Sequence, residues 1–523
     1  MKQEFTSAGF TGPLPPPAFN MAAYAIGRSA HAHPDRIALL VCDRPEGPPT
    51  ETWTFADLET ACLRIGAGLA RSGLNRGDRL IIRLPNTSQF AFVFFGAIAA
   101  GYVPVPTSTQ LTDRETAFLL RDSSAKLLCS DTAHAPGTVP DGVAQLTPDD
   151  LAKFQTDLAA TTYAETAADD PAYLIYTSGT TSQPKGVLHA HRAAWGRRPM
   201  YTGWYDIGAD DRMLHAGAFN WTYTLGTGLT DPWANGAMSI VYTGDKTPDV
   251  WPKLMQTHDA TLFAAVPGLY RQILKYARPG ASGLGPLRHG LIAGEQPPPG
   301  LLDEWRADNG RQLYEALGMS EISTYISSSP TSPPRPGFVG RPQPGRVVTI
   351  LPVDDGTDPL PPGEQGLLAI HRSDPGLMLG YWNRPDSVTA EVIRGDWFIG
   401  GDLAIQDADG YVAHRGRAND IMKALGYRVS PMEVEAVLAE IDDVAEVACA
   451  EIAVRSDVSV IGAFVVPRDP NRPPDPNVIH AHMQERLAQY KCPREIVFID
   501  ALPRTANGKL KRSELSQLGK PRS

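Results

Sequence analysis

The sequence is poor in cysteine and contains no long uninterrupted apolar run. Its five cysteines are odd in number and scattered over 523 residues, without the close spacing of a metal site or a redox pair. Such usage favours a reducing compartment, and we expect a cytoplasmic location. The most apolar stretch, residues 90–105, includes Pro104 and is shorter than the roughly 20 residues that cross a bilayer. The polar start of the chain shows no signal peptide, so no membrane insertion is expected.

Basic residues are the minority among the charged side chains. The chain has 58 acidic and 48 basic residues and a formal charge of −10, which argues against a nucleic-acid partner. A chain of this length is too long for a single hydrophobic core, so two or more domains are expected. The composition leaves the oligomeric state open, and a homo-oligomer is compatible with it.

Apolar periodicity predicts alternating helices and strands in the first part of the chain. Thr54 and Asp57 form a start signal close to a capping box, and a helix, a strand, a second helix and a second strand follow at 54–73, at 79–84, from about 88 and at 102–105. This β-α-β alternation predicts a parallel or mixed sheet that is covered by helices. The expected fold class is therefore α/β, with a large N-terminal domain of helix-covered sheets.

Two later stretches differ from this pattern. The proline-rich residues 330–344 precede short strand-like runs at 347–351 and 366–371, which predict a small β-rich subdomain. Beyond Arg417 the pattern predicts a small α+β domain, whose first helix would begin with a capping box of Ser430 and Glu433.

One stretch combines a strand with a loop of hydroxyls and glycines. Residues 173–187 have the sequence YLIYTSGTTSQPKGV. The glycines allow backbone amides to approach an oxyanion, the hydroxyls donate hydrogen bonds, and Lys185 adds a compact positive charge. This combination predicts a polyphosphate site, although a plain solvated loop has a similar composition. Because Lys185 is followed by Gly186, the stretch does not fit G-x-x-x-x-G-K-[ST], and an ordinary P-loop NTPase is disfavoured.

The words YTSGTTSQPKG resemble the phosphate loop of the adenylate-forming superfamily, which includes acyl-CoA synthetases, firefly luciferase and the adenylation domains of peptide synthetases. Further stretches match that superfamily in the same order. The resemblance implies that phosphate is bound by Thr177, Ser178, Gly179, Thr180, Thr181 and Lys185, and that adenine is lined by Gly294, Glu295 and Gln296. It also implies Glu321 as the Mg²⁺ ligand, Ser320 as a hydroxyl on phosphate, Asp402 and Arg417 as ribose contacts, and Lys509 as the lysine of the first half-reaction.

Taken singly, each of these charged residues could be an ordinary surface residue. Taken together, they favour an enzyme that uses ATP, Mg²⁺ and coenzyme A. Its carboxylic acid would attack the α-phosphorus of ATP to form an acyl-AMP, and positive charge from the metal and the lysines would stabilise the transition state. A catalytically silent acyl- or nucleotide-binding protein is expected to have lost Lys185, Glu321 or Lys509, and all three are present.

The second half-reaction needs a thiol, and none of the five cysteines lies in a sequence context typical of a catalytic nucleophile. The thiol is therefore expected from coenzyme A or, as the alternative, from the pantetheine of a carrier protein. The resemblance implies that a mobile C-terminal domain of residues 419–523 rotates against an N-terminal domain of residues 1–418. Asn419 would be the hinge, and the loop that contains Gly426 would border the pantetheine tunnel.

The acid would be bound by the segment 215–226, where the superfamily places its acid-recognising aromatics. Phe219, Trp221, Tyr223 and Gly318 are the candidate substrate contacts, although the aromatics could equally belong to the core. Overall length and the tail 490–494 are most similar to medium-chain and benzoate-type acyl-CoA ligases. A small or medium, largely apolar acid, aromatic or branched, is therefore expected.

The sequence departs from the superfamily pattern at three positions and contains one histidine pair that could suggest a metal. Leu317 stands where a tyrosine often stacks on adenine, which leaves Tyr314 or another aromatic for that role, and Gly400 and Asn419 replace the usual residues at their positions. His189 and His191 form an H-x-H pair without a third ligand, for which a structural or phosphate-side role is expected.

Overall fold

The computed structural model describes residues 9–177, 184–420, 422–424, 427–455, 458–504 and 510–518. These residues form two compact units. The first consists of Met1–Val348 and Ile370–Phe398, and the second of Thr349–Ala369 and Ile399–Ser523. The first unit contains helix-covered sheets and the smaller second unit mixes helices with strands, which confirms the predicted fold class. No helix in the described ranges is both long enough and apolar enough to cross a membrane.

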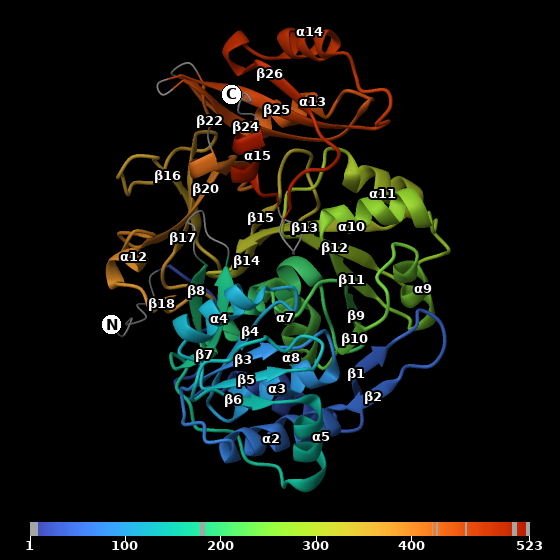
Figure 1. Ribbon diagram of the computed structural model, residues 1–523, viewed down its shortest axis with the longest axis vertical. Coiled ribbons are helices and arrows are strands. Elements are labelled where there is room, and N and C mark those ends of the chain that lie inside the picture. Colours follow the sequence, from blue (N-terminus) through green and yellow to red (C-terminus); the bar gives the residue numbers. More distant parts are fainter. Residues whose placement is uncertain are drawn as a thin grey trace. The chain divides into compact units, whose positions relative to one another are not determined.

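A nine-stranded sheet forms the centre of the first unit (Figure 1). The strands from β13 to β1 in the sheet are parallel, and antiparallel strands flank them on both sides. In sheet order the strands are β15 (Arg341–Pro342), β14 (Ser323–Ser327), β13 (Gln312–Met319), β12 (His289–Ala293), β11 (Leu262–Ala265), β9 (Arg212–His215), β10 (Met238–Tyr242), β1 (Ile37–Cys42) and β2 (Glu51–Thr54).

Both faces of this sheet are buried, because alternate residues of its strands enter different hydrophobic clusters. Phe263 and Ile292 pack with helices on one face, and Leu262 and Leu291 pack with Trp204 on the other. The helices of the first face are α9 (Val250–Thr257), α10 (Pro267–Gln272) and α11 (Leu301–Asn309) (Figure 1). The carboxyl ends of the parallel strands meet at one edge, which is where such sheets bind their ligands.

A second sheet of the first unit is parallel throughout and has the order β4-β3-β5-β6. The predicted capping box before α2 is confirmed, since Thr54 Oγ1 accepts the Asp57 N–H at 3.1 Å and Asp57 Oδ2 accepts the Thr54 N–H at 3.3 Å. The elements around this sheet are α2 (Phe55–Arg71), β3 (Arg79–Arg83), α3 (Ser88–Ala99), β4 (Val103–Pro106), α4 (Asp113–Asp122), β5 (Leu127–Ser130), β6 (Ala144–Leu146) and α5 (Pro148–Asp157).

A third, antiparallel sheet of the first unit has the order β18-β8-β7 and contains the flanks of the predicted phosphate loop. Its strands are β7 (Pro171–Thr177), β8 (Lys185–Ala190) and β18 (Gly380–Trp382). The remaining helices of this unit are short: α1 (Arg28–Ala32), α6 (Arg198–Met200), α7 (Thr222–Leu225), α8 (Asp231–Ala234) and α12 (Asp386–Ala390).

The second unit is built around β24 (Val444–Arg455), β25 (Val458–Pro467) and β26 (Glu495–Phe498). Helices α13 (Pro431–Leu438) and α14 (Pro476–Arg486) pack on one face of this sheet, and α15 (Arg512–Leu518) packs on the other. Most of a five-stranded sheet also belongs to this unit and forms the predicted β-rich region: β16 (Val348–Leu351), β17 (Gln365–His371), β20 (Trp397–Gln406), β19 (Ile393–Arg394) and β21 (Val412–Arg417). A small hairpin pairs β22 (Met422–Ala424) with β23 (Tyr427–Val429).

The predicted capping box of Ser430 and Glu433 is wrong. Ser430 occupies the N-cap of α13, but its side chain caps no backbone amide. Its hydroxyl donates instead to the Arg415 carbonyl at 3.2 Å, and the Glu433 carboxylate pairs with Lys491. Partners from distant segments therefore override the local signal.

A buried ion pair fixes the segment that follows β17 in the first unit. The Arg346 and Asp374 side chains are 0% and 1% exposed and lie 2.7 Å apart. Arg346 also donates to the Gly196 carbonyl at 2.7 Å, and Asp374 accepts the Gly376 N–H at 2.8 Å. Loss of one partner would leave a buried charge without compensation.

We therefore expect Asp374→Ala to lower the free energy of unfolding by about 3–5 kcal/mol. Asp303→Ala, which breaks the exposed Arg306–Asp303 pair at 3.2 Å, should change it by less than about 1 kcal/mol. Urea unfolding followed by circular dichroism measures both. If both substitutions lowered the free energy of unfolding equally, burial of the Arg346–Asp374 pair would not explain its contribution to stability.

Among the described residues of the first unit, five histidines, His189, His191, His215, His258 and His289, are buried, and burial lowers the pKa of each ring. The pKa falls to about 4 in His189, His191 and His289 and to about 3 in His215. His191 Nδ1 accepts the Met21 N–H at 3.0 Å, and His189 donates to a backbone carbonyl. The predicted structural role of the His189 and His191 pair agrees with these contacts.

These pKa values predict that stability falls as pH drops from about 6.5 toward 4. In that window the unfolded chain binds more protons than the folded one, so the free energy of unfolding decreases with falling pH. His191→Asn keeps an acceptor for Met21 and should make the decline shallower by up to about 1.4 kcal/mol per pH unit. Unfolding midpoints at several pH values test this, with exposed His31→Asn as the control. The same slope in all three proteins would contradict the assignment.

Candidate active site

The strands that flank the predicted phosphate loop form an antiparallel hairpin. Thr177, the last residue of β7, lies opposite Lys185, the first residue of β8. The four other predicted phosphate contacts, Ser178, Gly179, Thr180 and Thr181, lie outside the described residues. The hairpin thus places Thr177 and Lys185 together at the base of the predicted loop.

A tyrosine that the sequence analysis did not single out connects two of the predicted catalytic residues. The Lys185 Nζ atom lies 5.2 Å from the centre of the Tyr381 ring. The hydroxyl of the same tyrosine donates to Glu321 Oε1 at 2.9 Å. β18 pairs with β8 and brings Tyr381 next to Lys185, with Tyr381 opposite Val187. The structure therefore brings Lys185 to the ring and Glu321 to the hydroxyl of one tyrosine side chain.

Glu321 and Ser320 lie in the turn between β13 and β14. The turn is tight, because a Cβ atom at Gly318 would lie only 2.2 Å from the Ser323 carbonyl oxygen, and Ser323 adopts a left-handed φ of 74°. Both backbone carbonyls of the turn are held: His189 Nε2 donates to the Ser320 oxygen at 2.7 Å, and the Met378 N–H donates to the Glu321 oxygen at 2.8 Å. Gly318 thus has a clear structural reason to be glycine.

The predicted adenine segment follows the carboxyl end of β12. Gly294 has a φ of +101°, and a Cβ atom there would lie 2.4 Å from the Trp221 ring. Glu295 and Gln296 continue the loop. In the neighbouring β13, Glu315 is enclosed, and burial raises the pKa of its carboxyl to about 8. Tyr314, considered as a substitute for the missing adenine-stacking tyrosine, packs edge-on against His289 at 4.9 Å.

The predicted acid-binding aromatics differ in their surroundings. Phe219 is 3% exposed and packs against Phe90 in the large core cluster. The Tyr223 hydroxyl contacts the carbonyls of Ala265 and Leu291, each at 3.3 Å. Trp221 lies 5.5 Å from Tyr223 and against Gly294. Trp221 is thus the aromatic that joins the acid segment to the adenine segment.

Two buried polar atoms of the acid segment have no hydrogen-bond partner in the described structure: His215 Nε2 and Thr224 Oγ1. Both side chains flank Gly217, where a Cβ atom would lie 2.3 Å from Thr224 Oγ1 and 2.9 Å from His215 Cε1. The other ring nitrogen of His215 accepts the Gly217 N–H at 2.9 Å. Sequence reasoning named the segment but missed both residues, because burial without a partner is visible only in the fold.

The predicted ribose contacts belong to the second unit and meet across two antiparallel strands. Asp402 of β20 lies opposite Arg417 of β21, and Arg417 Nε is 3.4 Å from Asp402 Oδ1. His414 Nε2 is 3.1 Å from the same oxygen. Asn419 lies in the short 3-10 helix Ala418–Asp420 that follows. Gly426 and Lys509 lie outside the described residues.

The donor set around Glu321 fits Mg²⁺ bound together with a polyphosphate. Across the described ranges there is no group of three or more His, Cys, Asp or Glu side chains that could hold a metal ion alone. Mg²⁺ commonly uses one or two carboxylates and completes its shell with substrate phosphates and water. Glu321 would supply such a carboxylate, with the Lys185 ammonium close by for the same phosphates.

Comparisons with known proteins agree with this geometry. Residues 26–382 match the family model for AMP-binding enzymes, and residues 433–509 match the AMP-binding enzyme C-terminal domain. The 3-hydroxybenzoate–CoA ligase of Aromatoleum sp. (strain CIB) is 30% identical over 483 residues, which cover 89% of this chain and 91% of that enzyme. The mitochondrial acyl-coenzyme A synthetase ACSM2A of Homo sapiens is 31% identical over 493 residues, covering 88% and 84%.

The fold is also similar to that of a ligase whose structure was solved with a bound acyl-adenylate. The anthranilate CoA ligase AuaEII in complex with anthranoyl-AMP superposes with a TM-score of 0.86 at 26% identity, covering 97% of this chain and 98% of that chain. The family models together span most of the sequence. The chain therefore belongs to the family of AMP-binding enzymes, as an AMP-forming acyl-CoA synthetase.

Proposed function

We propose that this acyl-CoA synthetase activates a substituted aromatic carboxylic acid as its acyl-AMP and transfers the acyl group to coenzyme A, with release of AMP and pyrophosphate. The observation that carries the proposal is the grouping of Lys185, Tyr381 and Glu321 beside the predicted phosphate loop. It brings a fixed cation and a fixed carboxylate to one place, as a reaction at a polyphosphate requires.

In the first half-reaction a carboxylate oxygen of the acid attacks the α-phosphorus of ATP, and pyrophosphate leaves. Both reactants are anions, so charge repulsion is the main obstacle. Lys185 would bind the phosphates and stabilise the negative charge of the transition state, and Mg²⁺ bound to Glu321 would neutralise part of the polyphosphate charge. Lys509 is proposed to stabilise the same charge. A well-placed charged or hydrogen-bonding group of this kind contributes about 3 kcal/mol.

The ribose and adenine contacts are proposed from the chemistry of the side chains. The Asp402 carboxylate, 4% exposed and flanked by His414 and Arg417, can accept two hydroxyl donors of a ribose. Gly294, Glu295, Gln296 and Ser320 would complete the nucleotide site. These contacts would orient ATP so that its α-phosphorus faces the acid.

The second half-reaction uses an external thiol. Burial raises the pKa of all five cysteine thiols, to about 11 in Cys42 and further in the three most enclosed. None of them would supply a thiolate near neutral pH. Coenzyme A is the acceptor used by the named relatives, and it is favoured over a carrier protein.

We propose a domain boundary between residues 418 and 419, with Asn419 as the hinge and residues 419–523 as the mobile domain. The two family models end at residue 382 and begin at residue 433, so the boundary falls between them. A hinge needs a residue that can absorb a large backbone change, and asparagine tolerates unusual φ values well. The loop that contains Gly426 would then approach the pantetheine.

The acid is proposed to be aromatic and to carry a polar substituent. Phe219, Trp221 and Tyr223 give the acid segment its aromatic character, and Gly318 is the fourth proposed contact. His215 and Thr224 add two buried polar atoms without partners. Gly217 lies against both side chains, and a larger residue there would collide with them. A hydroxyl on the acid could accept from His215 Nε2 and bond Thr224 Oγ1, and an amino group could donate to Thr224 Oγ1, since unpaired buried polar groups are costly. Relatives named for 3-hydroxybenzoate and anthranilate support this class.

Thr224→Val keeps the volume of the side chain but removes its hydroxyl. It should lower the preference for hydroxy- or amino-benzoates over benzoate about tenfold in kcat/KM, because one hydrogen bond to the substituent is lost. AMP and acyl-CoA formation across a panel of aromatic and aliphatic acids gives these ratios. Activity with aliphatic acids alone, or an unchanged ratio in the variant, would contradict the proposed acid.

Tyr381→Phe should separate the two contacts of this side chain. The ring beside Lys185 remains, but the hydrogen bond to Glu321 is lost, so the Mg²⁺ concentration for half-maximal pyrophosphate release should rise about fivefold. Tyr381→Leu removes both contacts and should also raise the KM for ATP a few-fold, through loss of a cation–π contact worth about 0.5–1 kcal/mol. A Phe variant with the parent's Mg²⁺ dependence would show that the hydroxyl has no such role.

A further inference from the structure

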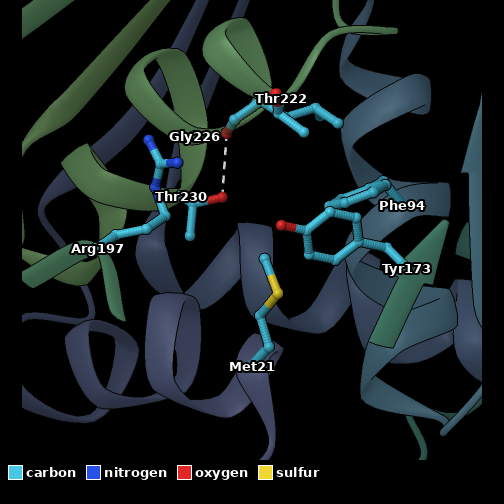
Figure 2. Close-up of a pocket in the computed structure, with 8 residues that line it drawn as sticks. Met21, Phe94, Tyr173, Arg197, Thr222, Gly226 and Thr230 are labelled. Carbon is cyan, nitrogen blue, oxygen red and sulfur yellow. Dashed lines mark hydrogen bonds between the residues drawn. The ribbon is translucent and has the colours of Figure 1, made fainter. Parts of the chain in front are cut away.

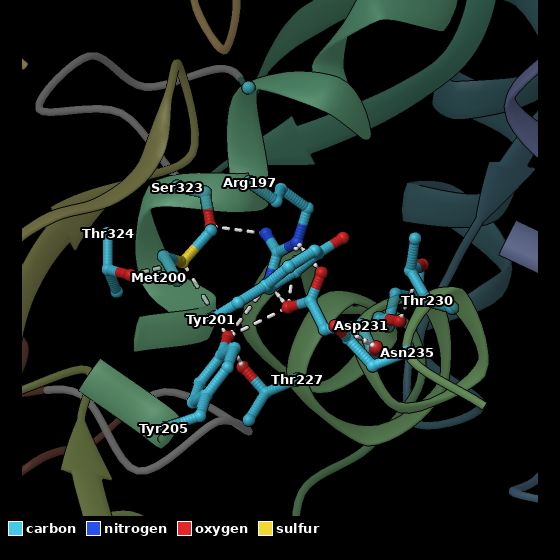
Figure 3. Close-up of polar contacts among 12 residues, drawn as sticks. Arg197, Met200, Tyr201, Tyr205, Thr227, Thr230, Asp231, Asn235, Ser323 and Thr324 are labelled. Atoms are coloured by element: carbon cyan, nitrogen blue, oxygen red, sulfur yellow. Dashed lines mark hydrogen bonds and ion pairs between the residues drawn. The ribbon is translucent and has the colours of Figure 1, made fainter. Parts of the chain in front are cut away.

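A buried ion pair lies next to the Glu321 turn and is saturated with hydrogen bonds (Figure 3). Arg197 Nε donates to Asp231 Oδ1 at 2.8 Å and to Oδ2 at 3.0 Å, and Arg197 Nη2 donates to Oδ2 at 2.6 Å. The two side chains are 6% and 0% exposed. The Tyr205 hydroxyl donates to the same carboxylate at 2.8 Å and bonds Thr227 at 2.9 Å. The guanidinium is therefore held in one orientation.

The remaining end of this guanidinium reaches the turn. Arg197 Nη1 donates to Ser323 Oγ at 2.5 Å, and Figure 3 shows Ser323 at the opposite side of the guanidinium from Asp231. Ser323 is the first residue of β14, two residues after Glu321, and has a left-handed φ of 74°. A residue other than glycine adopts that conformation only when its surroundings hold it there.

The segment 197–205 contacts β14 at two further places. Thr324 Oγ1 lies 2.7 Å from Met200 Sδ, and Ser327 Oγ donates to the Gly203 carbonyl at 2.7 Å. Of these contacts, only the Arg197 bond is made to a residue of unusual backbone conformation. It is also the one nearest to Glu321 in sequence. The bond to Ser327 therefore offers a matched comparison on the same strand.

We propose that the Arg197–Asp231 pair positions Glu321 for metal binding by holding Ser323, and hence the turn between β13 and β14, in its left-handed conformation. The inference rests on the metal role of Glu321 given under the proposed function. A buried ion pair contributes little net stability compared with apolar side chains of equal volume, so a positioning role explains its presence better than stability does.

Substitution of Arg197 itself would be hard to interpret. It would leave the Asp231 carboxylate buried without its partner. The guanidinium also borders a small pocket lined by Met21, Phe94, Tyr173, Thr222 and Thr230 (Figure 2), so a shorter side chain would enlarge an existing space. Ser323 is the better site for a test, because its replacement leaves the ion pair intact.

The test compares Ser323→Gly with Ser327→Ala. Glycine can adopt a φ of 74° but does not favour it over other values, so Ser323→Gly removes the side chain that Arg197 holds and frees the backbone of the turn without adding strain. The readout is binding of Mn²⁺ to the full chain with a non-hydrolysable ATP analogue, followed by electron paramagnetic resonance. We expect the dissociation constant for Mn²⁺ to rise about fivefold in Ser323→Gly and to stay at the parent value in Ser327→Ala. Ser323→Ala serves as a second variant with the same expected direction.

Glu321→Gln separates failure of this inference from failure of the proposed metal role. If Glu321→Gln weakens Mn²⁺ binding but Ser323→Gly and Ser323→Ala bind Mn²⁺ as the parent does, the positioning role of Arg197 is overturned. If Ser327→Ala weakens binding as much as the Ser323 variants, the effect is general loss of packing and the inference is also overturned. If Glu321→Gln binds Mn²⁺ normally, the metal role of Glu321 itself is wrong.

Discussion

One turn, held by several hydrogen bonds, carries the carboxylate that we propose as the metal ligand. The turn between β13 and β14 contains Glu321, and contacts from β8 and from residues 378–381 hold it. His189 of β8 binds the Ser320 carbonyl, Met378 binds the Glu321 carbonyl, and Tyr381 binds the Glu321 carboxylate. A carboxylate that must meet a metal ion and a triphosphate in one geometry gains from such preorganisation, because no reorganisation is needed during the reaction.

Two buried arginines, Arg192 and Arg346, fix residues 374–377, which precede the residues that contact the turn. Arg192 donates to the carbonyls of Pro375 and Leu377, each at 2.7 Å, just before Met378. Arg346 fixes Asp374 at the start of the same segment. Their guanidinium groups satisfy several backbone carbonyls at once, which a hydrophobic side chain cannot do. Arg192 and Arg346 thus hold the backbone segment that leads to Met378, whose N–H binds the Glu321 carbonyl.

The sequence predicted the fold class and the segments of the site better than it predicted their contacts. Alternating apolar strands and the capping box at Thr54 are local patterns, and both are present in the structure. The capping box at Ser430 failed because Arg415 and Lys491, both distant in sequence, attract its two side chains. Tyr381 was missed for a similar reason, because its partners Lys185 and Glu321 lie far away in the chain. The pairing of β18 with β8 brings it beside Lys185, and the bond from the Met378 N–H to the Glu321 carbonyl joins the same segment to the Glu321 turn. His215 and Thr224 likewise could not be recognised from the sequence, because only the fold shows that their polar atoms are buried without partners.

The most direct measurement is a crystal structure of the full chain with Mg²⁺ and a non-hydrolysable ATP analogue. The predicted result is a Glu321 oxygen about 2.0–2.1 Å from the metal, with the backbone from Ser320 to Ser323 in the conformation described above and Lys185 on the phosphates. A metal ion bound away from Glu321, or a turn that refolds when the nucleotide binds, would contradict a preorganised metal site.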